Sequence, residues 1–256
     1  MEKQYSSPFS LSGKTILISG ASSGIGRQVA IEVANSGGRT VLLGRDFSRL
    51  EETISNLNGE GHIFYSYDLN DIGGIQALVK QLVEDNGMFD GFVHSAGVEI
   101  TSPFKYTQVS DYESLYRINC LSAFEIIRHL NTIHSFSDGG SLVLIASISG
   151  VIGRKGLSAY SASKGALISA VRTLAPEFSK SKIRVNAVSP GTILTPMMRA
   201  ALDEMPEDVR ERRLSGFPLG LGTVEDVANG CLFLLSDASR WVTGQNLIID
   251  GGYTSI

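Results

Sequence analysis

A tyrosine and a lysine four residues apart are the first candidates for chemistry. Tyr160 and Lys164 lie in the stretch 158–178, SAYSASKGALISAVRTLAPEF, whose apolar residues Leu167 and Val171 recur at helical spacing. The same stripe, extended backwards, reaches Lys164 and Tyr160, so an ammonium group and a phenol lie on the face that should be buried. A nearby cation favours the phenolate, which predicts a lowered tyrosine pKa and proton exchange near working pH. Such pairs also arise by chance, so the rest of the chain must supply a cofactor site and a substrate anchor.

A glycine-rich turn is the candidate cofactor site. It reads SGASSGIG, and its candidate binding residues are Gly20, Ser22, Ser23, Gly24, Ile25 and Gly26. The spacing G-x-x-x-G-x-G differs from G-x-G-x-x-G, yet it offers the same tight turn and the same helix N-terminus aimed at a pyrophosphate. The serines add hydroxyl donors. A purely structural strand-to-helix turn is the alternative.

The residues after the second apolar run predict whether the adenosine ribose of the cofactor carries a 2′-phosphate or a free 2′-hydroxyl. Arg45 follows Gly44 directly, and an arginine there accommodates a 2′-phosphate, whereas a carboxylate would accept from a free 2′-hydroxyl. Arg45 therefore favours NADP(H) over NAD(H). Asp46 is interpreted as the N-cap of a helix over 47–57.

Two further strand ends carry residues suited to a nucleotide. Asp68 and Leu69 close the third strand, where the carboxylate either meets the adenine amino group or caps a helix that begins near Ile72. The pattern leaves both open. Ser95-Ala96-Gly97 ends the fourth strand and offers a small, flat surface beneath the cofactor.

Asn119 and Ser147 are the remaining polar candidates. Asn119 lies on the inner stripe of a long helix that a capping box, Ser110 to Glu113, is expected to open. Its amide is either satisfied by local backbone or bridges to a water near the site. Ser147 ends the fifth strand, and ligands bind at the carboxyl ends of such strands, although a terminal serine is commonly a turn former.

Seven short apolar runs must position these residues. They cover 14–20, 39–44, 62–67, 89–95, 142–147, 183–188 and 246–249, and helical stretches separate nearly all of them. This pattern is typical of strands buried on both faces. The sequence predicts an α/β fold: one doubly wound Rossmann-type domain over 1–256 with a seven-stranded parallel sheet. Ser158 is expected to cap the helix of Tyr160, and Pro176 to bend or end it.

Composition narrows the function further. The chain has 256 residues, 43% of them hydrophobic, and a net charge of −4, which gives no basic footprint for nucleic acid or an anionic membrane. No apolar run approaches the ~18 residues that span a bilayer, and the N-terminus has no signal-like core, so we expect a cytoplasmic protein. Cys120 and Cys231 are expected to be buried free thiols. The histidines show no metal-ligand spacing, so no metal site is expected.

Taken together, these motifs resemble the short-chain dehydrogenase/reductase family from about Leu11 to the C-terminus. The resemblance is carried by the glycine turn, Asn119, Ser147, Tyr160-Ser161-Ala162-Ser163-Lys164 and Pro190-Gly191, and the chain looks most like the 3-oxoacyl-[acyl-carrier-protein] reductase type. Two residues depart from the family pattern. Ser19 stands where threonine is usual, and Ser95 stands where asparagine is usual, which affects how the fourth strand is tied to its neighbours.

The resemblance implies roles for these residues. It implies that Ser147 holds the substrate oxygen, Tyr160 is the acid or base, Lys164 binds the nicotinamide ribose and lowers the tyrosine pKa, Asn119 anchors a proton-relay water, and Pro190, Gly191, Ile193 and Thr195 flank the nicotinamide. It also implies a homotetramer in which the helices of Tyr160 and Asn119 pack across subunits. The expected function is hydride transfer between NADP(H) and a carbonyl or secondary alcohol, of the 3-oxoacyl type or a related ketone.

The substrate is less defined. Residues 195–217 are the expected substrate lid, whose soft side chains suit an apolar pocket: Met197, Met198, Leu202, Met205 and Leu214. Arg210, Arg212 and Arg213 either receive an anionic substrate or form a solvated face. Asp138 lies where carrier-protein reductases tend to be basic, which leaves a carrier-borne substrate open.

Three alternatives accompany the favoured function. The first is an NAD-dependent alcohol dehydrogenase of the same fold. A non-catalytic dinucleotide-binding sensor would have lost Ser147, Tyr160 or Lys164, and all three are present. A nucleotide-sugar epimerase usually needs a further substrate domain, for which the 65 residues after Gly191 are too few.

Overall fold

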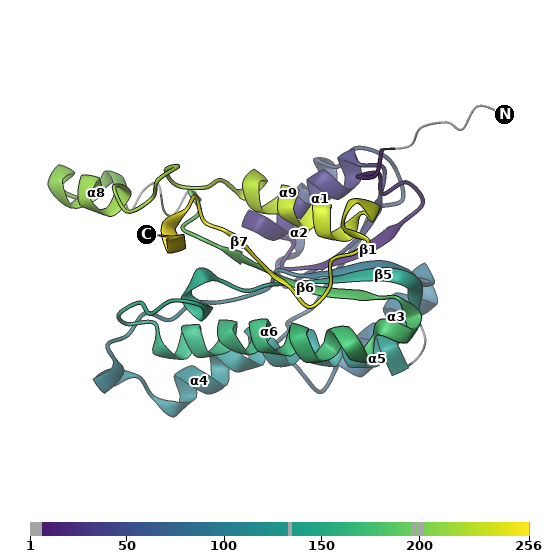
Figure 1. Ribbon diagram of the computed structural model, residues 1–256. Coiled ribbons are helices and arrows are strands. Elements are labelled where there is room, and N and C mark those ends of the chain that lie inside the picture. Colours follow the sequence, from purple (N-terminus) through teal and green to yellow (C-terminus); the bar gives the residue numbers. More distant parts are fainter. Residues whose placement is uncertain (1–6, 133–134, 196–197, 199–201, 256) are drawn as a thin grey trace.

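A seven-stranded parallel sheet lies between two layers of helices in the computed structural model (Figure 1). The structure describes residues 7–132, 135–195, 198 and 202–255. The strands are β1 (Thr15–Ser19), β2 (Arg39–Gly44), β3 (Ile63–Ser66), β4 (Phe89–His94), β5 (Phe136–Ile145), β6 (Arg184–Pro190) and β7 (Asn246–Ile249). Their order, β3-β2-β1-β4-β5-β6-β7, means that the chain starts in the middle and winds outward in both directions. The predicted doubly wound sheet is confirmed.

The helices cover the two faces of this sheet. They are α1 (Gly24–Asn35), α2 (Phe47–Ser55), α3 (Ile75–Asn86), α4 (Val109–Tyr116), α5 (Ser122–Thr132), α6 (Ser158–Glu177), α8 (Glu207–Leu214) and α9 (Val224–Leu235). In Figure 1, α1, α2 and α9 lie above the sheet and α3 to α6 below it. The central strand β1 contributes side chains to both cores: Leu17 lies in the core under α3, α5 and α6, whereas Ile16 and Ile18 lie in the core under α1 and α9. Strands buried on both faces account for the continuous apolar runs in the sequence.

Several element boundaries differ from the predicted ones. β5 begins at Phe136, six residues before the expected start, because 136–141 pairs with β4 across an irregularity between Phe89 and Gly91. The α3 helix begins at Ile75 and not near Ile72. The capping box of α4 consists of Gln108 and Asp111, so the prediction of Ser110 as the cap was wrong.

The helix of Tyr160 follows the predicted pattern closely. Leu167 and Val171 are fully buried, and Lys164 is 4% exposed. The helix ends at Glu177, directly after Pro176, as expected of a proline. Ser158, however, is the first residue of the helix, and its N-cap is Leu157; the cap prediction was wrong.

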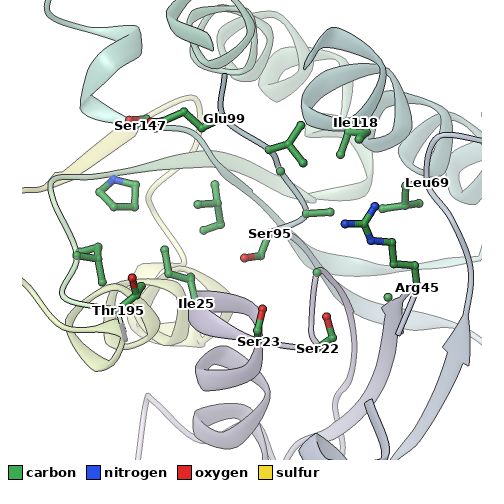
Figure 2. Close-up of a pocket in the computed structure, with 18 of the residues that line it drawn as sticks. Ser22, Ser23, Ile25, Arg45, Leu69, Ser95, Glu99, Ile118, Ser147 and Thr195 are labelled. Carbon is green, nitrogen blue, oxygen red and sulfur yellow. The ribbon is translucent and has the colours of Figure 1, made fainter. Parts of the chain in front are cut away.

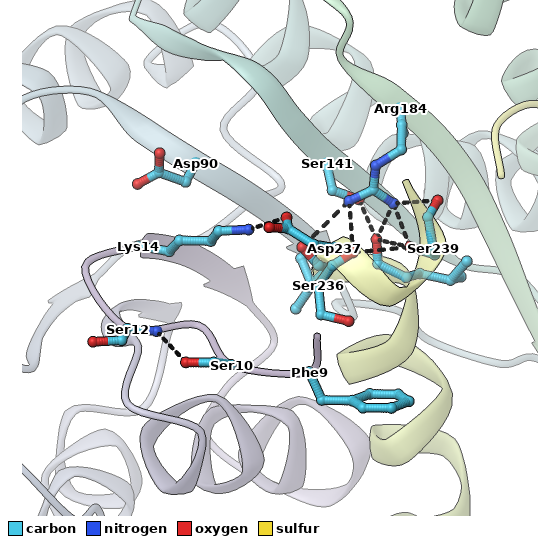
Figure 3. A network of polar contacts seen from close by, with 12 residues as sticks. Phe9, Ser10, Ser12, Lys14, Asp90, Ser141, Arg184, Ser236, Asp237 and Ser239 are labelled. Atoms are coloured by element: carbon cyan, nitrogen blue, oxygen red, sulfur yellow. Dashed lines mark hydrogen bonds and ion pairs between the residues drawn. The ribbon is translucent and has the colours of Figure 1, made fainter. Parts of the chain in front are cut away.

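A hydrogen-bond network around Arg184 lies at the amino end of β6 and connects this strand to the end of α9 (Figure 3). Arg184, at the start of β6, is 7% exposed and donates to Leu235 O, Ser236 O and Ser239 Oγ. These groups follow the end of α9, where a cation also opposes the negative end of the helix dipole. Lys14 adds an ion pair with Asp237 at 2.7 Å, which ties β1 to the same corner.

Two findings bear on the composition-based expectations. Cys120 and Cys231 are buried free thiols, as predicted. Within the part of the chain that the structure describes, no helix is long and apolar enough to cross a membrane.

Candidate active site

A cavity of about 600 Å³ opens at the carboxyl ends of the central strands (Figure 2). It brings together most of the predicted site residues from distant parts of the chain: Gly20, Ser22, Ser23, Ile25, Arg45, Asp68, Leu69, Ser95, Ala96, Gly97, Ser147, Tyr160, Lys164, Pro190, Gly191, Ile193 and Thr195. Parallel strands place their carboxyl ends at one edge, which is why these residues meet.

Three predicted residues, Gly24, Gly26 and Asn119, do not line the cavity. Gly26 packs against the turn itself, because a Cβ there would collide with Gly20 O. Gly20 has φ +69°, and a Cβ on it would lie 2.6 Å from Ala96 N. These glycines therefore allow the turn to pass close to the end of β4.

The cavity also contains residues that the sequence reasoning missed: Gly44, Asp46, Arg49, Tyr67, Val98, Glu99, Ile118, Ile145 and Ala146. Most of them directly adjoin a predicted residue at a strand end, so a wider window around each strand end would have found them. Arg49 is different, because it comes from the first turn of α2. Glu99 lies on the loop after β4, two residues beyond Gly97.

The N-terminus of α1 is suited to an anion. Its N-cap, Ser23, makes no side-chain capping bond to any described residue, and the first turn carries no acidic side chain. The first backbone N–H groups of a helix have no intrahelical partner, and they lie at the positive end of the helix dipole. The turn therefore fits the pyrophosphate of a dinucleotide.

Two arginines and two aspartates, Arg45, Arg49, Asp46 and Asp68, line one end of the cavity. Asp46 Oδ1 accepts a hydrogen bond from Arg49 N at 3.1 Å, so Asp46 caps α2 as predicted. Its carboxylate also lies 3.7 Å from Arg49 Nε. Because Asp46 caps α2 and pairs with Arg49, the Arg45 guanidinium is the group at this end with no ion-pair partner within 4.0 Å among the described residues, and a guanidinium suits a phosphate.

Asp68 lines the cavity but does not cap α3. Its Oδ1 accepts from Asn70 N at 3.0 Å and closes a tight turn. Asp71 Oδ1 instead accepts from Gly74 N, one residue before α3 begins. The helix-cap interpretation of Asp68 was therefore wrong.

Tyr160 and Lys164 share the opposite end of the cavity, from the first two turns of α6. Lys164 Nζ donates to Ile145 O at 2.8 Å and lies 5.8 Å from the centre of the Tyr160 ring. Burial lowers the pKa of Lys164 to about 8. Burial also raises the pKa of Tyr160 to about 12, with the charge of Glu99 adding to the rise and the Ser147 hydroxyl and Arg154 opposing it.

This direction is opposite to the sequence-based expectation that Lys164 lowers the tyrosine pKa. The ammonium group is bonded to a backbone carbonyl of β5, and desolvation is the largest effect on the phenol. In this structure Tyr160 is therefore a protonated phenol at neutral pH.

Ser147 is oriented by the chain that follows it. Its Oγ accepts a hydrogen bond from Ser149 N at 3.1 Å and so caps the short helix Ile148–Gly150. Because one lone pair is taken by the backbone, the hydroxyl hydrogen is available for donation to an oxygen in the cavity.

Asn119 lies just behind the cavity wall in a π-helical turn, Arg117–Leu121, between α4 and α5. Its amide accepts from Val98 N at 2.9 Å and donates to Val98 O at 3.0 Å and Ser163 Oγ at 2.9 Å. The side chain is thus satisfied by protein groups, which answers the question left open by the sequence. It fixes the loop after β4 to α6. A proton-relay water at Asn119 stays a prediction.

A buried histidine ties β1 to β4 near the two unusual serines. His94 Nδ1 lies 2.9 Å from Ser19 Oγ, and Ala96 N donates to the same oxygen at 3.4 Å. Burial and nearby Lys164 lower the pKa of His94 to about 3, so the imidazole is neutral. The contacts of Ser19 Oγ with His94 and Ala96 N therefore tie the end of β1 to the end of β4.

Comparison with known proteins is consistent with this site. A family model described as enoyl-(acyl carrier protein) reductase matches residues 20–254. A 3-oxoacyl-[acyl-carrier-protein] reductase of Thermotoga maritima is 36% identical over 94% of this chain and 98% of its own length. A glucose 1-dehydrogenase of Gluconobacter oxydans is 33% identical over 94% of this chain and 92% of its own. A crystal structure of a putative short-chain alcohol dehydrogenase from Sinorhizobium meliloti has a TM-score of 0.90 at 29% identity, covering 97% of this chain and 99% of that one.

Proposed function

The chain belongs to the short-chain dehydrogenase/reductase family, and on that premise we propose that it transfers a hydride between NADP(H) and a ketone or secondary alcohol, of the 3-oxoacyl type or a related one. The family consists of oxidoreductases that bind a nicotinamide dinucleotide. The observation that carries the proposal is one cavity lined by Ser147, Tyr160, buried Lys164 and Arg45. Figure 2 shows Ser147 and Arg45 on opposite sides of this cavity.

The residues divide the reaction between them. The nicotinamide, when bound, supplies or accepts the hydride. Ser147 donates a hydrogen bond to the substrate oxygen, and Tyr160 gives a proton to that oxygen or takes one from it. Lys164 is the donor for the ribose hydroxyls next to the nicotinamide. Asn119 keeps the loop after β4 and the helix of Tyr160 in register through Val98 and Ser163.

The protonation state of Tyr160 sets how the rate of each direction depends on pH. A phenol with a pKa of about 12 is a proton donor at neutral pH, and a developing alkoxide needs that proton. We therefore propose that ketone reduction keeps its rate around neutral pH and loses it as pH approaches the tyrosine pKa. Oxidation requires the phenolate and is expected to gain rate as pH rises toward the tyrosine pKa.

Two finer points are part of the proposal. NADP(H) is favoured because Arg45 and Arg49 line the ribose end while Asp46 is engaged as a helix cap. An NAD-dependent alcohol dehydrogenase is the second candidate, since the relatives named above act on both 3-oxoacyl groups and glucose. A sensor without activity is disfavoured because all three reacting side chains point to one cavity.

Nucleotide titration combined with one variant tests the function. In a titration followed by the fluorescence of the protein or nucleotide, the Kd for NADPH should be at least about tenfold below the Kd for NADH. Arg45→Ala should make the two Kd values equal. Tyr160→Phe should bind NADPH as the wild type does and lose at least about a hundredfold in turnover of ketones, because the proton donor is gone. Tyr106→Phe, on an exposed side chain, is the matched control. Unchanged turnover in Tyr160→Phe would rule out the catalytic assignment, and equal affinity for NADH would make the NAD-dependent enzyme the leading function.

A further inference from the structure

Glu99 is a carboxylate in the cavity to which the reaction described above gives no task. It is exposed and lies on the loop that follows β4, directly after Val98. The Asn119 side chain bonds both the N–H and the C=O of Val98. Its Oε1 accepts a hydrogen bond from Thr101 Oγ1 at 3.3 Å. Among the described residues no cation pairs with it within 4.0 Å. An ionised oxygen therefore remains available for a ligand in the cavity.

The position of Glu99 is at the reacting end. Figure 2 shows it beside Ser147 and far from Arg45. Its charge also raises the pKa of the Tyr160 phenol, so the carboxylate lies within electrostatic reach of the proton-transfer group. A substrate whose oxygen meets Ser147 and Tyr160 would therefore bring its neighbouring carbons to Glu99.

The chemistry of a carboxylate limits what those carbons can carry. A carboxylate only accepts hydrogen bonds, so it pairs with a hydroxyl or ammonium group and repels another anion. Ser147, Tyr160 and Thr195, which share the cavity with Glu99, contribute hydroxyls. Lys164 is the cation at this end, but its ammonium group donates to Ile145 O and is assigned above to the ribose of the nucleotide. A neutral, hydroxyl-bearing substrate is the one that satisfies all of these groups.

Resting on the hydride transfer proposed above, we propose that Glu99 is a specificity-determining residue that accepts a hydrogen bond from a hydroxyl on the carbon next to the reacting carbon. The preferred substrates are then vicinal diols and the matching hydroxyketones. Substrates with a carboxylate at that carbon are disfavoured. This preference limits the substrates to a subset of the ketones and alcohols that the proposed hydride transfer could act on.

Three alcohols that differ at one carbon test this assignment. The kcat/KM values of butane-2,3-diol, butan-2-ol and lactate are measured in wild type, Glu99→Gln and Glu99→Ala. A hydrogen bond to a charged group is worth about 1.5–3 kcal/mol, so the wild type should prefer the diol over butan-2-ol by at least about tenfold. In Glu99→Ala that ratio should fall toward one, and the kcat/KM for lactate should rise relative to that for butan-2-ol. Glu60→Gln, at an exposed position on the loop before β3, removes an equal charge and should keep the wild-type ratios.

A pH profile separates this role from a structural one. Because the Glu99 charge raises the pKa of Tyr160, Glu99→Gln should move the tyrosine limb of the oxidation profile to lower pH. A loop that was merely loosened would not produce that shift. Equal diol preference in wild type and Glu99→Ala, with wild-type melting temperatures, overturns the role of Glu99 and leaves the hydride transfer standing. Absence of turnover of all three alcohols and their ketones with either nucleotide rejects the hydride transfer, and the role of Glu99 with it.

Discussion

At the scale of single residues, the site depends on a lysine whose charge is costly. Lys164 is 4% exposed, and its pKa falls from an ordinary value of 10.5 to about 8 because burial disfavours the ammonium form. At 1.36 kcal/mol per pKa unit, the charged group costs the folded state about 3 kcal/mol below that pH. Only one backbone carbonyl, Ile145 O, is bonded to it in the described structure. Such a cost is typical of residues retained for function.

This cost predicts a stability gain when the charge is removed. The folded pKa lies below the unfolded one, so the destabilisation is complete below about pH 8 and fades as pH rises toward 10.5. Lys164→Met should therefore raise the melting temperature of the nucleotide-free protein at pH 7, by an amount that shrinks between pH 8 and 10.5, and should abolish turnover. Scanning calorimetry over that pH range measures the effect, with Lys80→Met, a 75% exposed lysine, as the control. A lower melting temperature at pH 7 would show that the ammonium group is stabilising.

At the scale of elements, helix ends and irregular turns place the side chains. The π-helical turn Arg117–Leu121 rotates Asn119 onto the loop after β4, and Ser147 is held by the short helix that it caps. The C-terminal end of α9 is organised in another way, by a side chain from β6. Arg184 supplies the donors that the last carbonyls of a helix lack.

Replacing this arginine should weaken the protein without damaging the cavity. Arg184→Met leaves Leu235 O and Ser236 O without their buried donor, which costs about 3 kcal/mol or more. The free energy of unfolding should fall by that amount, which lowers the urea midpoint. The Kd of the folded protein for NADPH should stay unchanged, since the cavity is at the other end of the strands. Arg172→Met, on the exposed side of α6, is the control. An unchanged urea midpoint would show that water replaces the arginine.

At the scale of the whole molecule, one face of the structure has an uncovered apolar groove. It runs between α5 and α6, and the residues that line it are Phe124, Ile127, Arg128, Asn131, Ala170, Thr173, Leu174, Glu177 and Phe178. The small residues Ala162, Ser169 and Thr173, on the outer side of α6, are exposed, so the face is not packed within the chain. The homotetramer implied by the family resemblance would cover it.

This predicts association through α5 and α6. A large charged side chain in the groove would meet its own copy, so Ala170→Arg should give a smaller species than wild type at equal concentration. Sedimentation velocity measures the change. Ser55→Arg, at the exposed end of α2, is the control and should sediment like the wild type. A wild-type protein that sediments as a monomer at micromolar concentration would contradict the prediction.

The sequence by itself determined the sheet of this protein and predicted most of the residues that line its cavity. The bounds of β2 and β7 agree with the predicted runs to the residue, and the buried stripe of α6 was read correctly through Lys164. These features depend on periodicity and on short motifs, which are local properties of the chain. Caps were less predictable, since Asp46 was identified correctly whereas Ser158 was not.

Only the tertiary structure decided how the site is charged. It showed that burial raises the pKa of Tyr160 although Lys164 is a neighbour on the same helix. It also showed that the Asn119 amide forms hydrogen bonds with Val98 and Ser163. It also brought Arg49 and Glu99 into one cavity. Desolvation and long-range contacts depend on which elements pack together, and no local pattern in the sequence encodes them.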